Sequence, residues 1–125
     1  MAKTRVLLVD DEHELVYTTA ERLEMRGYEV DAVTDGAEAI TRAGQNRYDV
    51  AVVDVKMPGV SGLAVLRSLR ESQPELPVIL LTGHGSSTDG EDGIELGAAA
   101  YLFKPVKLTD LIDAMTKATR AHHDD

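Results

Sequence analysis

The chain has 125 residues, a formal net charge of −9 and no cysteine. We expect one domain over residues 1–125, with an ordered core at 4–119 and a disordered tail at 120–125. The acidic balance argues against direct binding of nucleic acid or an anionic membrane, and the lack of cysteine excludes disulfides and thiol chemistry. No apolar stretch approaches the roughly 18 residues of a membrane span and no signal-peptide pattern is present, so we expect a cytoplasmic protein.

The chain begins with a short strand and a helix. Residues 5–9 form an apolar run typical of a buried strand, and three acidic residues follow it directly, Asp10, Asp11 and Glu12. Beyond them, apolar and small residues recur at helical spacing, namely Leu15, Val16, Thr19, Ala20 and Leu23. Gly27 is expected to end this helix, because glycine adopts the left-handed conformation without steric cost.

The central part of the chain contains an edge strand, a helix and then a strongly apolar strand. Residues 29–33 alternate like a half-buried edge strand, and residues 35–43 form a small Ala-rich helix. Residues 50–53 are apolar and mostly β-branched, which is typical of a strand buried on both faces of a parallel sheet. This strand ends at Asp54, and residues 57–59 form a Met-Pro-Gly turn behind it. An ionised carboxylate in that position costs free energy unless another group pairs with it.

Three helices and two strands complete the pattern. The first of these helices directs three leucines inward, Leu63, Leu66 and Leu69. Residues 78–81 and 99–103 read as strands, and a weak helix with two internal glycines covers about 88–96. A last amphipathic helix carries Leu108, Leu111, Ile112 and Met115 on one face.

The pattern is therefore five strands alternating strictly with five helices, without a linker or repeat. Alternating units with apolar strands predict an α/β domain, in which helices cover both faces of a parallel sheet through right-handed crossovers. Ligands of such folds bind beyond the carboxyl ends of the strands.

Polar residues end four of the five expected strands: Asp10 with Asp11, Asp54, Thr82 and Lys104. Three carboxylates brought together repel one another, and a hard divalent cation, Mg²⁺ above all, relieves this repulsion. Lys104 adds a point charge and Thr82 a hydroxyl donor, an arrangement that stabilises a transferring phosphoryl group. Asp54 would then be the nucleophile that forms an acyl phosphate.

Four stretches of the chain resemble the signatures of response-regulator receiver domains of two-component signalling. They are VDDE at 9–12, VDVKMPG at 53–59, LTGHG at 81–85 and YLFKP at 101–105, and the resemblance covers about residues 4–119. It implies a flavodoxin-like, doubly wound sheet of five parallel strands in the order 2-1-3-4-5. It also implies a cis peptide bond between Lys104 and Pro105.

The resemblance assigns a role to each site residue. Asp54 would be the phosphoacceptor, Asp11 a direct Mg²⁺ ligand and Asp10 a ligand through water. The backbone carbonyl of Lys56 would also contact the metal. Thr82 would bind a phosphoryl oxygen, Lys104 would pair with the phosphate, and Tyr101 would be the aromatic switch.

The expected function is a phosphorylation-dependent switch and not a classical enzyme. A sensor histidine kinase or phosphotransfer protein would donate the phosphoryl group, and the 82–101 face would then control an output domain or partner. The receiver would catalyse only its own phosphorylation and dephosphorylation. Homodimerisation on phosphorylation is a further expectation, and the motifs resemble receivers of transcription regulators or hybrid histidine kinases.

Several alternatives stay open at the level of sequence. Asp10 and Asp11 are also suited to capping the first helix, while Thr82, Lys104 and Tyr101 are compatible with plain structural roles. A small Mg²⁺-dependent phosphohydrolase of the haloacid dehalogenase type also forms an aspartyl phosphate, but an Asp-x-Asp pattern after the first strand is missing. A flavodoxin-like cofactor binder would need a phosphate loop where the acidic residues 10–12 stand.

The weak fourth helix supports a hypothesis about the switch. Each interior glycine costs about 1 kcal/mol of helix stability relative to alanine. We therefore expect residues 86–93 to be mobile without phosphorylation and to order on activation, the alternative being a short helix without signalling consequence.

Overall fold

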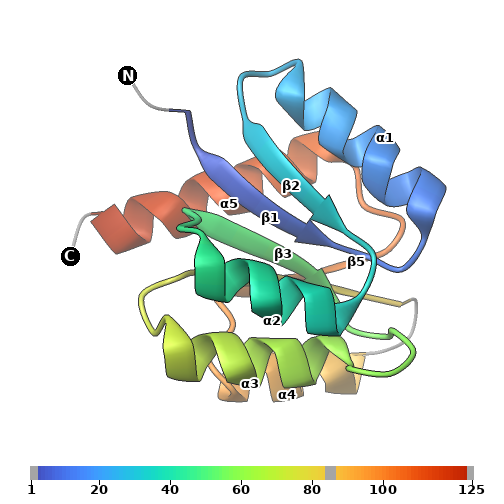
Figure 1. The fold of residues 1–125 in the computed structure, drawn as a ribbon, viewed down its shortest axis with the longest axis vertical. Helices are drawn as coiled ribbons and strands as arrows, with labels where there is room; N and C mark the ends of the chain where they lie inside the picture. Colours follow the sequence, from blue (N-terminus) through green and yellow to red (C-terminus); the bar gives the residue numbers. More distant parts are fainter. Residues whose placement is uncertain (1–2, 84–86, 124–125) are drawn as a thin grey trace.

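The computed structural model describes residues 3–83 and 87–123, in which strands and helices alternate strictly (Figure 1). The strands are β1 (Arg5–Val9), β2 (Glu29–Val33), β3 (Val50–Asp54), β4 (Val78–Thr82) and β5 (Ala100–Phe103). The helices are α1 (His13–Glu24), α2 (Gly36–Gln45), α3 (Gly62–Ser72), α4 (Ser87–Glu95) and α5 (Leu108–His123).

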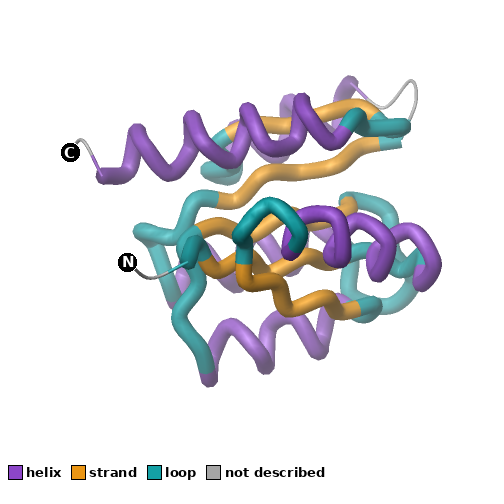
Figure 2. The backbone as a smooth tube through the Cα atoms, turned by 90° about the horizontal axis from the view of Figure 1, so that it is seen from above, coloured by secondary structure: helices purple, strands orange, loops and turns teal. Residues whose placement is uncertain are grey.

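The strands form one parallel sheet in the order β2-β1-β3-β4-β5. This order and the alternation confirm the predicted doubly wound α/β fold. The tube view shows the strands between helices on both sides (Figure 2). The Lys104–Pro105 peptide bond is cis, as the family resemblance implied.

Two apolar clusters, one on each face, hold the layers together. Alternation along β1 sends Leu7 and Val9 to the cluster beneath α2 and α3, and sends Val6 and Leu8 to the cluster beneath α1 and α5. All five residues of β3 and all five of β4 are buried. The strand that ends at Asp54 is therefore enclosed on both faces, as its sequence predicted.

The helix ends follow local chemistry. The side chains of Asp35 and Ser61 cap α2 and α3, accepting hydrogen bonds from the amides of Ala37 (2.8 Å) and Ala64 (3.2 Å). Gly27 lies behind α1 with a φ of 93°, which confirms its predicted left-handed conformation. The helical pattern placed Leu15 on the buried face of α1, and this prediction was wrong. Leu15 is 44% exposed, because the helix turns Val16, Ala20 and Leu23 toward the sheet instead.

A polar network links β1, β2 and the segment that precedes β3. The Tyr48 hydroxyl donates to Asp31 at 2.6 Å, and the Arg5 guanidinium lies 5.3 Å from the centre of the Tyr48 ring. Arg5 also lies 3.7 Å from Asp31, and its backbone amide donates to Asp49 at 2.7 Å. Burial and the hydrogen bond to Asp31 raise the pKa of Tyr48 to about 12, so the neutral phenol is strongly favoured. β1, β2 and the start of β3 are thereby held in one register.

Helix α4 begins one residue earlier than expected, at Ser87, and Gly93 has a packing role in it. Gly93 is buried, and a Cβ at this position would lie 2.1 Å from the Leu80 side chain of β4. A glycine here lets the helix approach the strand closely, so it is more than a weak point of the helix. Residue 86 lies outside the described residues, and ordering of 87–93 on activation stays a prediction.

Helix α5 extends farther than expected. A disordered tail was predicted from residue 120, but the helix continues to His123. The sequence explains this extension, because neither glycine nor proline interrupts it between Leu108 and His123. Residues 124–125 of the expected tail lie outside the described residues. Within the described chain, no helix is both long and apolar enough to cross a membrane.

Candidate functional site

Three carboxylates converge where β1 and β3 end. Each of Asp10, Asp11 and Asp54 offers an oxygen, and these oxygens lie within 4.8 Å of one another. The parallel register explains the convergence, since it pairs Val9 with Val53 and so sets the residues that follow side by side. Asp10 is only 2% exposed and Asp54 only 5%, so two of the three carboxylates are buried. The expected acidic cluster therefore forms.

Lys104 is the cation that faces this cluster. Its Nζ lies 2.9 Å from Asp10 Oδ2, 3.3 Å from Asp54 Oδ2 and 3.4 Å from Glu12 Oε1. Its backbone amide donates to the carbonyl of Thr82 at 2.8 Å, which holds the end of β5 against β4. Lys104 is thus no solvated loop lysine, because its side chain reaches past β4 to carboxylates of the two central strands.

Burial and the neighbouring charges shift the pKa values of both Asp54 and Lys104. Burial raises the pKa of Asp54 to about 6, with Lys104 opposing this rise and the charges of Asp10 and Asp11 adding to it. Burial lowers the pKa of Lys104, but the hydrogen bond to Asp10 and the charges of Asp10 and Asp54 outweigh it, so the net shift is upward. One ammonium does not neutralise three carboxylates. The excess negative charge suits a divalent cation with oxygen ligands.

Thr82 adds an unsatisfied polar group at the end of β4. Its side chain is completely buried, and its Oγ1 has no hydrogen-bond partner among the residues that the structure describes. A buried hydroxyl without a partner costs about 1–3 kcal/mol. Thr82 is the register partner of Phe103, the residue that precedes Lys104, so this unsatisfied hydroxyl belongs to the same edge of the sheet as the charged groups.

Asp10 accepts a backbone hydrogen bond in addition to its contacts in the acidic cluster. Its Oδ1 accepts from the Glu12 amide at 3.0 Å, while its Oδ2 accepts from Lys104. Glu12 is the N-cap of α1 and makes no side-chain cap bond. Asp10 and Asp11 are therefore not caps of the first helix in the ordinary sense.

The turn behind Asp54 brings in a residue that the sequence prediction missed, Gly62. Its amide donates to the Val55 carbonyl at 2.8 Å, and an added Cβ would lie 2.1 Å from the Asp54 carbonyl oxygen. The first turn of α3 is thus packed directly against the Asp54 backbone. Glycine directly after the N-cap Ser61 was the available signal. Lys56, the expected carbonyl ligand, is exposed in the same turn.

Tyr101, the expected switch residue, lies on β5. It is partly buried against the cluster beneath α2 and α3, and its ring centre lies 5.6 Å from that of Phe103. Phe103 was not singled out by the sequence. The two residues share one face of the strand because they are two positions apart.

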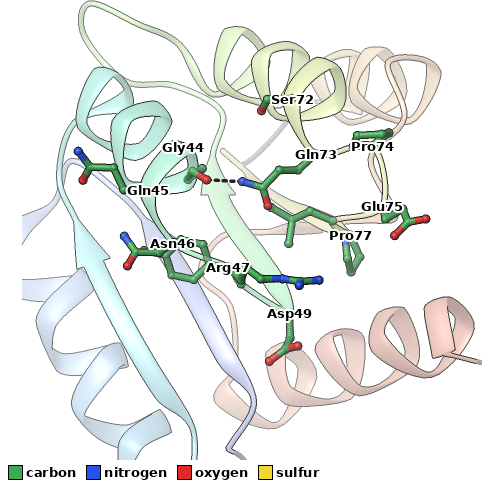
Figure 3. A pocket seen from close by; sticks show the side chains of 13 residues that line it. Gly44, Gln45, Asn46, Arg47, Asp49, Ser72, Gln73, Pro74, Glu75 and Pro77 are labelled. Carbon is green, nitrogen blue, oxygen red and sulfur yellow. Dashed lines mark hydrogen bonds between the residues drawn. The ribbon is translucent and has the colours of Figure 1, made fainter.

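A hollow of about 840 Å³ lies at the opposite edge of the sheet from the acidic cluster (Figure 3). It is formed by the segments before β3 and β4, and the Gln73 side chain donates to the Ala43 carbonyl within it. Tyr48 lines this hollow, and burial with the hydrogen bond to Asp31 raises its pKa, which keeps the phenol neutral. The chemistry of a reactive site is concentrated at the acidic cluster.

Comparisons with known proteins agree with this geometry. The family model of the response regulator receiver domain matches residues 6–116. The chain is 37% identical over 120 residues to the transcriptional regulatory protein YkoG of Bacillus subtilis, covering 96% of this chain and 53% of that protein. It is 39% identical over 108 residues to the transcriptional regulatory protein PrrA of Mycobacterium tuberculosis, covering 86% and 46%. The chain thus spans about half the length of these relatives.

Solved structures match over nearly the whole chain. A response regulator receiver domain protein from Clostridium thermocellum superimposes with a TM-score of 0.91 at 33% identity, covering 96% of this chain and 97% of that one. FixJ-N gives a TM-score of 0.88 at 31% identity, with 96% of each chain covered. With the matched fold, the motif positions and the converging acidic residues, the chain belongs to the response regulator receiver domain family of two-component signalling.

Proposed function

We propose that this receiver is switched by phosphorylation of Asp54 in a Mg²⁺-dependent step. The observation that carries the proposal is the convergence of Asp10, Asp11 and Asp54 around the Lys104 ammonium at the carboxyl edge of the sheet. A buried carboxylate at the end of a rigid strand is a well-positioned nucleophile.

The donor set fits Mg²⁺. Carboxylates of Asp10, Asp11 and Asp54 with the backbone carbonyl of Lys56 would hold the ion, and hard oxygen ligands are those that Mg²⁺ prefers. When bound, the ion would neutralise the carboxylates and the charge that develops on the phosphoryl oxygens. The excess of carboxylates over ammonium groups in the site supports this assignment.

The chemical step is a displacement at phosphorus. An Asp54 carboxylate oxygen forms the new P–O bond while the P–N bond to the phosphohistidine of a histidine kinase or phosphotransfer protein breaks, and the electron pair leaves with the imidazole. Lys104 pairs with the transferred group, and the Thr82 hydroxyl donates to one of its oxygens, which satisfies its buried Oγ1. Hydrolysis of the acyl phosphate resets the switch.

The signalling output would depend on Thr82 and Lys104, the same two residues that contact the phosphoryl group. Recruitment of Thr82 and Lys104 would shift the 82–101 face and Tyr101. Because the relatives include transcriptional regulatory proteins and the chain spans about half their length, we propose that this face controls a transcriptional output. A full population shift from 1:99 to 99:1 requires about 5.5 kcal/mol, which several charge-assisted hydrogen bonds can supply.

Incubation with acetyl phosphate and Mg²⁺ tests the proposal. The intact mass should rise by one phosphoryl group in the wild type and in Asp110→Asn, an exposed control on α5, but not in Asp54→Asn. The rise should need the divalent ion and disappear with a chelator. Labelling that persists in Asp54→Asn would refute the assignment, and phosphate release through many rapid turnovers would favour the hydrolase alternative.

A further inference from the structure

Strand β5 carries a pair of aromatic rings, Tyr101 and Phe103, and the proposed function gives a role to Tyr101 alone. The rings of Tyr101 and Phe103 meet edge to face, with centres 5.6 Å apart and planes at 89°. Tyr101 is partly buried, whereas Phe103 is 47% exposed. Phe103 is the only phenylalanine of the chain, and it occupies an edge strand of the sheet.

Phe103 lies between two residues of the site. Across the sheet it is the register partner of Thr82, and along the chain it precedes Lys104. The backbone amide of Lys104 donates to the Thr82 carbonyl at 2.8 Å, while its Nζ contacts Asp10 and Asp54. A shift of either neighbour therefore acts on the backbone of Phe103.

Two of the aligned residue pairs of β4 and β5 share one face of the sheet. Leu80 pairs with Tyr101 and Thr82 with Phe103, and side chains two positions apart on a strand point to the same side. Tyr101 and Leu80 pack into the same apolar cluster, and Thr82 Oγ1 is buried without a partner among the described residues. Phe103, the exposed ring of the pair, is thus aligned with the residue that carries the unsatisfied hydroxyl, and Tyr101 lies one aligned pair farther into the apolar cluster.

We propose that Phe103 is a positioning residue for Tyr101. Its ring holds Tyr101 in the arrangement of the unphosphorylated protein, and this contact rearranges when the site is filled, so that Phe103 forms the exposed end of the switch. The inference rests on the proposed function, because it needs a group on Asp54 that recruits Thr82 and Lys104.

The direction of the effect follows from the proposed assignment of the ring contact to the unphosphorylated arrangement. An interaction made in the unphosphorylated arrangement opposes the other one, and removing it shifts the balance toward the activated arrangement. Edge-to-face pairs contribute enough to change such a balance by about three- to tenfold. Loss of the Phe103 ring should therefore make the site easier to fill.

The single phenylalanine provides a direct probe. Protein labelled with fluorophenylalanine has one protein fluorine resonance, from position 103. Beryllofluoride with Mg²⁺, used as the phosphoryl mimic, should move this resonance in the wild type. The shift should be lost in Asp54→Asn, and it should be reduced in Tyr101→Leu while the fluorine signal of bound beryllofluoride remains.

A matched pair of variants tests the energetic claim. Phe103→Leu keeps an apolar side chain without a ring edge and should lower the beryllofluoride concentration at half-saturation about three- to tenfold. Phe103→Tyr keeps the ring and should match the wild type. Thermal unfolding followed by circular dichroism verifies that both variants fold.

Two failures can be told apart. Absence of acetyl phosphate labelling on wild-type Asp54 would refute the proposed function itself. Normal labelling with an unmoved Phe103 resonance, or equal half-saturation in the wild type and Phe103→Leu, would overturn the role of Phe103 alone. A Phe103→Tyr variant that behaves like Phe103→Leu would do the same.

Discussion

Replacing Gly62 with alanine would put a methyl group into the backbone that carries Asp54. The new Cβ would lie 2.1 Å from the Asp54 carbonyl oxygen, 2.6 Å from the Val55 Cα and 2.8 Å from the Asp54 carbonyl carbon. All three are backbone atoms of buried residues, so no side-chain rotation relieves the contact. Either α3 or the end of β3 has to move.

The cost can be worked out from the contacts. Overpacking a close-packed site costs about 1–3 kcal/mol. Loss of the hydrogen bond from the Gly62 amide to Val55 adds about 0.5–1.5 kcal/mol. The higher helix propensity of alanine returns at most about 1 kcal/mol. The sum is a net loss of about 0.5–3.5 kcal/mol, and its midpoint of about 2 kcal/mol would lower Tm by roughly 10 °C for a domain of this size.

Gly44 provides the matched control. It is exposed near the end of α2, and an added Cβ would meet nothing within 4 Å. Gly44→Ala should therefore raise the free energy of unfolding by about 0.4–1 kcal/mol. Urea unfolding followed by circular dichroism measures both variants, and acetyl phosphate labelling reports on Asp54. We expect Gly62→Ala to be labelled more slowly, because its nucleophile is displaced.

The result that would refute this reasoning is specific. If Gly62→Ala unfolds at the wild-type urea concentration and is labelled at the wild-type rate, α3 does not pack against the Asp54 backbone as described. If Gly44→Ala is destabilised as much as Gly62→Ala, the loss comes from glycine replacement in general and not from this contact.

Three further predictions concern the charged site, the polar network and α4. The folded-state pKa of Asp54, about 6, lies above its ordinary value of 3.8, so its contribution to stability is complete below about pH 4 and is lost as pH rises through 6. Without divalent metal, Asp54→Asn should therefore raise the free energy of unfolding by about 1–2 kcal/mol at about pH 8 and by little at about pH 4, and a loss at pH 8 would contradict this. Tyr48→Phe should cost about 1–2 kcal/mol in urea unfolding, because the partly buried hydrogen bond to Asp31 is lost, and a neutral result would mean that the network adds nothing. The pKa of Tyr48 is raised above its ordinary 10.0 to about 12, so the wild type should lose this stability as pH rises through that range, and Tyr48→Phe should not. Amide exchange of residues 87–93 should slow when beryllofluoride binds, and equally strong protection in both states would reject ordering of α4.

Much of the fold could be predicted because most of the strands are continuous apolar runs, whereas the helices show apolar residues at helical spacing. The apolar run at 50–53 predicts a strand enclosed on both faces, and β3 is buried at every position. Periodicity is less decisive on α1, where Leu15 fits the helical pattern and yet lies on its exposed side. A stripe of apolar residues gives the direction of a helix face only to within about one position.

The site could be predicted as far as it depends on strand ends. Asp10, Asp11 and Asp54 come together because parallel strands bring their carboxyl ends to one edge. The contacts of Gly62 and Gly93 could not be predicted in this way, because they depend on which backbone or side chain a helix meets. The Tyr101–Phe103 contact likewise depends on ring orientation, which no spacing rule specifies.

The ion pairs of Lys104 have a thermodynamic consequence for the edge of the sheet. β5 has only four residues and one neighbouring strand, and Lys104 anchors its end to carboxylates of the two central strands. Any cation that binds those carboxylates competes for the oxygens that Lys104 contacts. By reciprocity, whatever loosens Lys104 also changes the affinity of the carboxylates for the cation. Attachment of the outermost strand and occupancy of the acidic cluster are therefore two linked equilibria.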